Sequence, residues 1–237
     1  MIPALDEAAG LARLLPQVQA LGVGCIVVGD NGSRDATAQV ARSCGARVVH
    51  EPRRGYGAAC AAALGDVPAE HDVIVFLDAD VSDDPAQLPT LAAPVLADEA
   101  DLVIGCRDAA LRDPGAFTLP QRFGNWLATR LIRLGWGYAY RDLGPFRAIR
   151  RAALERIQMQ DRAFGWTVEM QVRALDLKLR IRQISVPYRR RVGRSKISGT
   201  LRGVVLAGYW ILSTLGRLYV RSLRARRDGF RSSGAPR

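Results

Sequence analysis

The sequence predicts an α/β protein with a mostly parallel central sheet that is covered by helices on both faces. Short, almost continuously apolar segments alternate with helical segments through residue 105, as in parallel strands joined by crossover helices. Polar motifs follow the apolar segments directly, and in open α/β sheets ligands bind at the carboxyl ends of the strands. The chain has 237 residues, 49% of them hydrophobic, which suffices for one sizeable domain with its own core.

The first half of the chain carries the regular part of this alternation. Its predicted strands are residues 25–29, 46–50, 72–77 and 101–105, and its predicted helices are residues 34–44, 57–66 and 85–97. A helical segment begins within a few residues of Met1, so that only the end of an earlier strand remains. We therefore expect a truncated first strand and no signal peptide.

The second half is less regular. We expect, in order, a loop over 107–120, an amphipathic helix over 121–135, a strand over 144–150, a helix over 164–176, a strand over 179–187, a basic loop over 189–196 and a long helix over 201–225. The main domain is expected to span residues 1–200. An apolar and basic helix over 201–227 and a disordered tail over 228–237 would follow it.

Charge is distributed unevenly along the chain. Residues 1–140 carry 11 Lys and Arg against 17 Asp and Glu, whereas residues 141–237 carry 23 against 6. A basic surface attracts phosphates, nucleic acids or anionic lipids. The two halves are therefore expected to do different work.

The strongest motif is Asp78-Ala79-Asp80, directly after the apolar segment "VIVFL". Two carboxylates at positions i and i+2 beyond a buried strand end can reach one divalent cation. Mg²⁺ or Mn²⁺ keeps several waters and bridges such carboxylates to substrate phosphates. A solvated acidic turn is the alternative interpretation, because Asp83 and Asp84 follow closely.

Two further motifs follow predicted strands. In "GDNGSRD" (29–35), Asp30 is placed to accept hydrogen bonds from a nucleobase or a ribose, although an ordinary Asn-Gly turn with a helix cap has the same pattern. In "EPRRGYGAA" (51–59), Gly55 and Gly57 open a helix beside Arg53 and Arg54. Exposed backbone N–H groups at such a helix start favour an anion such as a diphosphate.

Together, these motifs resemble those of the family-2 glycosyltransferases, whose nucleotide-sugar-binding fold is called GT-A. The matching segments are "IPALDE" (2–7), "GDNGSRD" (29–35), "RRGYGAA" (53–59), "FLDAD" (76–80), "IGCR" (104–107), "DLGPFRAIRR" (142–151), "GWTVEMQ" (165–171) and "YRRRVGRSKISGT" (188–200). Their order is similar to that in the branch of dolichyl-phosphate-mannose synthases and polyprenyl-phosphate glycosyltransferases. The resemblance covers residues 2–200 and implies inverting, metal-dependent transfer of a sugar from a UDP- or GDP-sugar.

The resemblance also implies how the donor would be bound. Glu7 and Asp30 match positions that hold the base and the ribose, and Asp78 and Asp80 match the metal and diphosphate motif. Ser82 stands where lipid-phosphate mannosyltransferases often have Gln. The positions that match the basic loop near the phosphates are Arg190, Ser195 and Lys196.

The remaining assignments concern the acceptor and the chemistry. Arg107 and Arg147 match basic positions near the donor phosphates or the acceptor, and Glu169 lies in a segment that faces the acceptor. A polyprenyl phosphate is already anionic and needs little general base. A hydroxyl acceptor needs a carboxylate to take its proton, and the candidates for that role are Glu169 and then Asp142.

The C-terminal helix indicates contact with a membrane surface. Residues 203–216 carry no charge but would span only about 21 Å, short of the ~30 Å hydrocarbon core. An interfacial helix, aided by the helix over 121–135, is therefore expected, with packing on the sheet or in a homodimer as the alternative. Four cysteines without metal-ligand spacing are interpreted as buried free thiols of a reducing cytosol. The expected location is the cytoplasmic face of the membrane.

Three alternatives remain open from the sequence. The acceptor can be a soluble hydroxyl compound in place of a lipid phosphate. A sugar-1-phosphate nucleotidyltransferase also binds substrate phosphates with the help of a metal ion, although it normally has a Gly-rich basic loop where "IPALDE" stands. A non-catalytic lipid- or nucleic-acid-binding protein is suggested by the isoelectric point of about 10.3. Our primary prediction is the enzyme, with no nucleic-acid partner.

Overall fold

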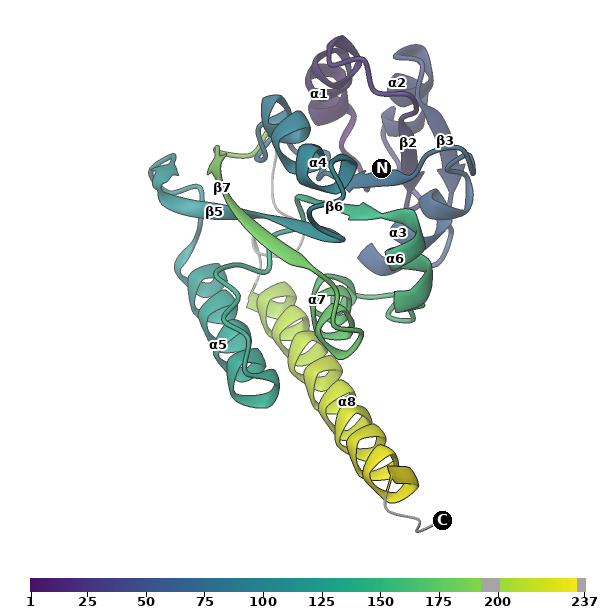
Figure 1. Cartoon of the computed structure of the whole chain (residues 1–237). Coiled ribbons are helices and arrows are strands. Elements are labelled where there is room, and N and C mark those ends of the chain that lie inside the picture. Colours follow the sequence, from purple (N-terminus) through teal and green to yellow (C-terminus); the bar gives the residue numbers. More distant parts are fainter. Residues whose placement is uncertain (193–200, 234–237) are drawn as a thin grey trace.

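The computed structural model describes residues 1–192 and 201–233 and, within the last helix, the side chains of 205, 206 and 208–224. Its helices are α1 (Ala8–Ala20), α2 (Thr37–Ser43), α3 (Tyr56–Gly65), the short 3₁₀ helix η1 (Pro85–Gln87), α4 (Leu88–Leu96), α5 (Leu119–Trp136), α6 (Arg151–Ile157), α7 (Trp166–Asp176) and α8 (Leu201–Ser233). Figure 1 shows α1 and α2 at one end of the molecule and α5, α7 and α8 together at the other.

The strands form two sheets that meet edge to edge. One sheet is parallel, in the order β1 (Ile2–Ala4), β2 (Val27–Asp30) and β3 (Arg47–His50). The other is mixed, in the order β4 (Val73–Phe76), β6 (Arg147–Arg150), β5 (Leu102–Arg112) and β7 (Ile181–Tyr188). The Met1 amino group donates to Val75 O at 2.8 Å, and Leu77 N donates to Met1 O at 3.1 Å. These bonds place β1 beside β4 and align the carboxyl ends of β1, β2 and β4.

Two apolar clusters cover the two faces of this sheet. Leu102 and Ile104 belong to the cluster under α5, α7 and α8, whereas Val103 belongs to the cluster under α1 and α4. This alternation is the period of two that a strand imposes. Helices therefore cover both faces, as the sequence predicted. Of the four free cysteines, Cys60 and Cys106 are buried and the other two are half-buried.

The structure corrects several boundaries. Strand β6 is antiparallel to both β4 and β5, because an apolar pattern predicts a strand but not its direction. Strand β5 extends to Arg112, inside the predicted loop over 107–120, by pairing with β7. Helix α6 was not predicted. Helix α8 continues to Ser233, through much of the tail predicted to be disordered.

Helix α8 packs against α5 and α7. The rings of Trp136 and Tyr219 lie 5.7 Å apart, and Ser222 Oγ donates to the Asp176 carboxylate at 2.8 Å. Both figures show the C-terminal part of α8 extending past the rest of the protein. Among the described residues, no helix combines the length and the apolar character that a membrane span requires.

Candidate functional site

A cavity opens where the carboxyl ends of β1, β2 and β4 meet. Its volume is about 290 Å³. The polar residues that line it include Glu7, Asn31, Arg54, Tyr56, Asp78, Asp80 and Arg191. The parallel strands therefore bring together segments that are far apart in the sequence, as expected for an α/β sheet.

Asp78 and Asp80 leave β4 at the floor of this cavity. Tyr56 Oη donates to Asp78 Oδ1 at 3.1 Å, and the Ser82 amide and hydroxyl donate to Asp80 Oδ1 at 3.0 and 2.5 Å. The next turn is strained, because Val81 has a φ of 62°, which β-branched residues rarely adopt. Such strain is often held at functional sites.

The neighbouring cationic side chains do not fully neutralise the buried carboxylates of this turn. Burial first, and the negative charge of Asp80 second, raise the pKa of Asp78 to about 7. Burial and the neighbouring Asp78 also raise the pKa of Asp83, whose two buried carboxylate oxygens have no hydrogen-bond partner in the described part of the chain. An added cation would relieve this excess of negative charge.

The donor set fits a divalent cation of the kind that substrate phosphates complete. No group of three or more His, Cys, Asp or Glu residues is placed to hold a metal among the residues described. Mg²⁺ and Mn²⁺ are commonly bound by one or two carboxylates, with waters and phosphate oxygens filling the other positions. Asp78 and Asp80 would hold such an ion, which would supply charge stabilisation for a diphosphate leaving group.

The described residue of the basic loop that faces this cavity is Arg191. Its Nη2 donates to Glu7 Oε1 at 3.0 Å, and its Nη1 lies 3.4 Å from Asp80 Oδ2. Arg190, which was predicted for this role, turns away: its amide donates to Asp113 Oδ2 and its Nε to Pro114 O. The predicted residues Ser195 and Lys196 lie outside the described residues. The sequence pattern marked the loop as basic but missed Arg191.

The start of α3 does not present the free N–H groups that were expected there. Gly55 N donates to Asn31 Oδ1 at 2.9 Å, and the amides of Gly57 and Ala58 donate to backbone carbonyls of residues 162 and 163. A Cβ at Gly55, whose φ is 150°, would lie 2.0 Å from Arg162 O. Gly55 and Gly57 therefore permit the close approach of this loop, and Arg54 is the charged group that α3's entry offers the cavity.

Asp30 is held at the end of β2. Its Oδ1 accepts from Ser33 N at 3.0 Å, and its Oδ2 lies 3.3 Å from His50 Nδ1. Its side chain is buried. Asn31, the next residue, lines the cavity directly. The predicted contact between Asp30 and the base or ribose of a donor stays a prediction.

Arg107 and Asp142 form a buried pair beside a second cavity. Arg107 donates through Nε and Nη2 to the two Asp142 oxygens at 2.7 and 2.6 Å, and its guanidinium lies 4.3 Å from the Phe117 ring centre. This cavity, about 400 Å³ in volume, lies between α5 and α8. Arg107 is the only charged side chain among its described lining residues, which are mostly apolar.

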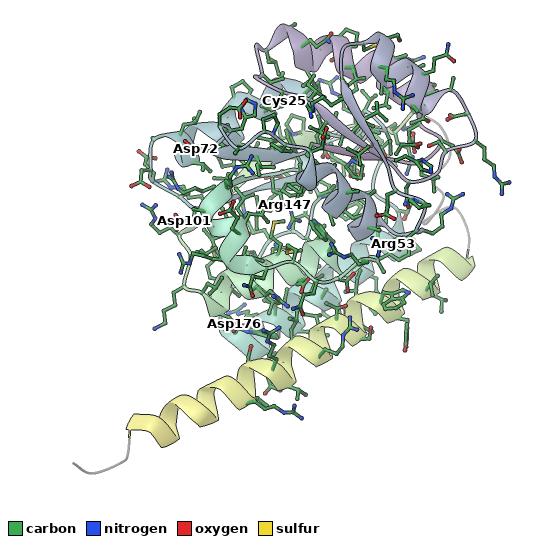
Figure 2. All side chains as sticks on the ribbon, turned by 90° about the vertical axis from the view of Figure 1, so that its right-hand side faces the viewer. Cys25, Arg53, Asp72, Asp101, Arg147 and Asp176 are labelled. Atoms are coloured by element: carbon green, nitrogen blue, oxygen red, sulfur yellow. The ribbon has the colours of Figure 1, made fainter. Side chains whose placement is uncertain are left out.

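Arg147 lies in the interior of the protein (Figure 2) and binds backbone. Its guanidinium donates to the carbonyl oxygens of Gly144, Pro145 and Thr167. It forms no ion pair with a carboxylate of the described chain, and burial lowers its pKa. This geometry favours a role in holding β6 against α7 over the predicted role near the donor phosphates or the acceptor.

Glu169 is the predicted general base, and its carboxylate is engaged in α7. Oε2 accepts from the amides of Gln160 and Asp161 at 2.9 and 2.7 Å, and Oε1 forms a buried ion pair with Arg173 at 2.8 Å. It lines a third cavity, separate from that of Asp78 and Asp80. The base role therefore stays a prediction, and a structural role is evident.

We expect Glu169→Gln to destabilise the protein. Breaking one side of a buried ion pair leaves Arg173 uncompensated and costs about 3 kcal/mol. The measurement is urea unfolding of the variant and of the wild type. The exposed Glu155→Gln serves as a matched control with no change expected. Equal unfolding free energies of Glu169→Gln and wild type would contradict the structural role.

We expect stabilisation by Mn²⁺ to depend on pH through Asp78. In the folded protein without metal, Asp78 keeps its proton up to about pH 7, whereas the ordinary pKa of an aspartate is 3.8. The protonated Asp78 therefore contributes to stability at low pH, and this contribution is lost as the pH rises through 7. A cation needs the ionised carboxylate and binds more weakly below that pH. The rise in Tm caused by Mn²⁺ should be larger at pH 8 than at pH 6. A rise that is equal at both pH values would argue against this site.

Comparisons with known proteins show which proteins this chain resembles in sequence. The family model described as glycosyl transferase family 2 matches residues 1–158. The chain is 38% identical over 210 residues to an uncharacterized glycosyltransferase of Mycobacterium tuberculosis, covering 87% of this chain and 92% of that protein. It is 31% identical over 183 residues to the dolichyl-phosphate hexose transferase of Haloferax volcanii, covering 76% and 77%.

A solved structure with a similar fold is that of glucosyl-3-phosphoglycerate synthase from Mycobacterium tuberculosis, in complex with Mn²⁺, UDP-glucose and phosphoglyceric acid. The TM-score is 0.75 at 24% identity, covering 92% of this chain and 78% of that one. The fold is therefore GT-A, as the sequence predicted.

Proposed function

The chain belongs to glycosyltransferase family 2, and from that premise we propose that it transfers a sugar from a nucleotide-sugar donor to a polyprenyl phosphate. The cavity of Asp78 and Asp80 would take the donor diphosphate with Mg²⁺ or Mn²⁺. Displacement at the anomeric carbon would proceed with inversion. A nucleotidyltransferase activity has no support in these relatives, which are glycosyltransferases.

The observation that carries the acceptor class is the cavity between α5 and α8. A polyprenyl phosphate needs an apolar channel for its tail and a cation for its head. Leu127, Ile211 and Leu212 supply apolar walls, and Arg107 supplies the charge. Asp142 engages Nε and Nη2 of Arg107, and Nη1 makes no hydrogen bond to a described residue. That edge of the guanidinium would bind a phosphate.

The engagement of the two candidate bases supports the same choice. A hydroxyl acceptor must lose a proton to a general base. Asp142 is paired with Arg107, and Glu169 with Arg173. A phosphate acceptor is already anionic and would react without either of them. The name of one relative, a dolichyl-phosphate hexose transferase, is also in keeping with a lipid phosphate.

The exposed faces of α5 and α8 support peripheral contact with a membrane. Large apolar side chains are exposed on both helices: Leu119, Phe123, Trp126, Leu131, Leu134, Val205, Leu206, Tyr209, Leu212, Tyr219, Val220 and Leu223. Such a face would lie in the interfacial layer of the bilayer. The protein would then work at the cytoplasmic face of the membrane, where a lipid acceptor resides.

The direct test is a transfer assay with two acceptors. UDP- and GDP-sugars are offered with Mn²⁺, either with undecaprenyl phosphate in detergent or with glycerol as a soluble hydroxyl acceptor. We expect labelled sugar in the lipid extract and none on the hydroxyl compound. Transfer to the hydroxyl alone would contradict the proposed acceptor class. Calorimetric titration with UDP and GDP, each with and without Mn²⁺, identifies the donor nucleotide.

Membrane contact is tested separately by flotation. The protein is centrifuged with vesicles of phosphatidylcholine, with and without phosphatidylglycerol. We expect it to float with the anionic vesicles. Protein that remains entirely in the soluble fraction in both cases, but forms dimers at the same concentration, would show that the apolar face is a dimer interface.

A further inference from the structure

A third cavity, outside the proposed donor and acceptor sites, lies between α7, α8 and the loop that joins α6 to α7. Its volume is about 580 Å³. The arginines in its wall are Arg54, Arg162, Arg173, Arg217 and Arg221. Of the described residues that line the donor cavity, only Arg54 also lines this one. Helices α7 and α8 contact one another here and at Asp176, which Figure 2 labels.

The acidic side chains in the wall do not neutralise these arginines. Asp161 Oδ1 accepts from the amides of Ala163 and Gly165, and its Oδ2 accepts from the Thr214 hydroxyl at 2.8 Å. Arg217, at 3.4 Å, is its only arginine partner in the described chain. Glu169 is held by two backbone amides and Arg173. The arginines in the wall therefore carry more positive charge than its carboxylates neutralise.

Three of the arginines carry that excess. Arg54, Arg162 and Arg221 are exposed, and none of them has a carboxylate within ion-pair distance in the described part of the chain. Side chains from three separate segments thus present unpaired guanidinium groups to one hollow. Guanidinium groups bind phosphate oxygens with paired, charge-assisted hydrogen bonds.

Arg173 forms the buried wall of the hollow. Its Nη1 donates to Ile157 O and Gln158 O, whereas its Nε is buried and has no acceptor among the described residues. Burial lowers the pKa of Arg173, and the positive charge of Arg221 lowers it further. Arg173 and Arg221 therefore repel one another across the contact between α7 and α8, and an anion between them would turn this repulsion into attraction.

We propose that this hollow is a further anion site, separate from the proposed donor and acceptor sites, which binds a phosphate group between Arg162 and Arg221 and fastens α8 to the body of the enzyme. The phosphate can come from the headgroup of an anionic phospholipid or from a free phosphate compound, because both present the same oxygens. Arg54 connects the hollow to the donor cavity, so that occupancy would also bias the position of that side chain.

The test compares two double variants with equal loss of charge. Arg162→Gln with Arg221→Gln removes two of the three unpaired guanidinium groups of the hollow and leaves Arg54, which also lines the donor cavity. Arg130→Gln with Arg224→Gln removes two exposed arginines of α5 and α8 that do not line it. Inorganic phosphate is titrated by calorimetry, and vesicles of phosphatidylcholine with phosphatidylglycerol are titrated by flotation. Phosphate that binds in the donor cavity contributes equally to both variants and cancels in the comparison.

We expect the hollow variant to bind phosphate or anionic vesicles at least about tenfold more weakly than the control variant, since charge-assisted hydrogen bonds are lost. A difference in the vesicle titration alone identifies a lipid headgroup, and a difference with inorganic phosphate identifies a free phosphate compound. Without any anion, the hollow variant should melt no lower than the wild type, because a repulsion is removed. Equal binding by the two variants in both titrations would overturn the proposal. If the double variant fails to fold, Arg221→Gln alone is compared with Arg224→Gln.

Discussion

Replacing Asp80 with Asn is expected to lower kcat/KM by about a thousandfold. A bound cation contributes several kcal/mol of charge stabilisation at a leaving phosphate, and about 4 kcal/mol corresponds to a factor of about 10³. Asp80 would supply one of the two protein carboxylates for that ion. Asn keeps the size and one acceptor oxygen, so the bonds from Ser82 to Oδ1 can persist. The loss therefore reports on charge and not on folding.

The matched control is Asp72→Asn. Asp72 is exposed and precedes β4, whereas Asp80 follows the same strand at its other end. Both variants lose one negative charge. We expect Asp72→Asn to keep wild-type activity and Mn²⁺-dependent binding of the nucleotide, and Asp80→Asn to lose both. An active Asp80→Asn variant would remove the metal from the proposed reaction.

The position of Asp78 and Asp80 could be predicted from the sequence because the signal is local. An apolar strand that ends in two carboxylates can place them only at the carboxyl edge of the sheet. Strands β1 and β2 end at the same edge, where Glu7, whose place only the resemblance implied, lines the cavity beside Asn31, which was not predicted. The strand-end argument thus placed Asp78 and Asp80, but it missed Asn31, although Asn31 directly follows β2.

The roles of the three consecutive arginines that follow β7 could not be predicted in this way. Arg189 pairs with Asp84 at 2.7 Å, Arg190 binds the turn after β5, and Arg191 faces Glu7 and the site. Their side-chain types are identical, so only the path of the turn separates them. That path depends on partners more than 70 residues away in the sequence.

Gly55, Gly57 and Glu169 show a second limit of prediction from the sequence. A helix start with Gly55 and Gly57 has the composition of an anion site, yet amides of this helix start donate to backbone carbonyls of the loop over 160–164. A carboxylate in a matching motif is a candidate general base, yet the carboxylate of Glu169 is already paired with Arg173 and accepts hydrogen bonds from backbone amides. Sequence patterns give the available chemistry, and tertiary contacts decide which groups remain available to a substrate.

Filling the cavity between α5 and α8 is expected to separate a lipid acceptor from a soluble one. Gly124 lies in α5 and lines this cavity, and a Cβ at that position would meet no atom within 4 Å. A leucine there therefore starts from an open Cβ position at the wall of the channel, and its side chain would take up space that the lipid needs. It also replaces a glycine inside a helix, which favours the folded state by roughly 0.5–1 kcal/mol. Loss of function would thus not come from unfolding.

We expect Gly124→Leu to raise the KM for a polyprenyl phosphate by about fiftyfold. Each displaced CH₂ of the lipid costs about 0.8 kcal/mol, and three of them cost about 2.4 kcal/mol. Gly216→Leu is the control, because Gly216 is an exposed glycine of α8 with open space around its Cβ and no place in the cavity. Donor binding should be unchanged in both variants. If Gly124→Leu and Gly216→Leu transfer to the lipid phosphate equally well, the tail does not lie in this cavity, and the acceptor must approach Arg107 by another route.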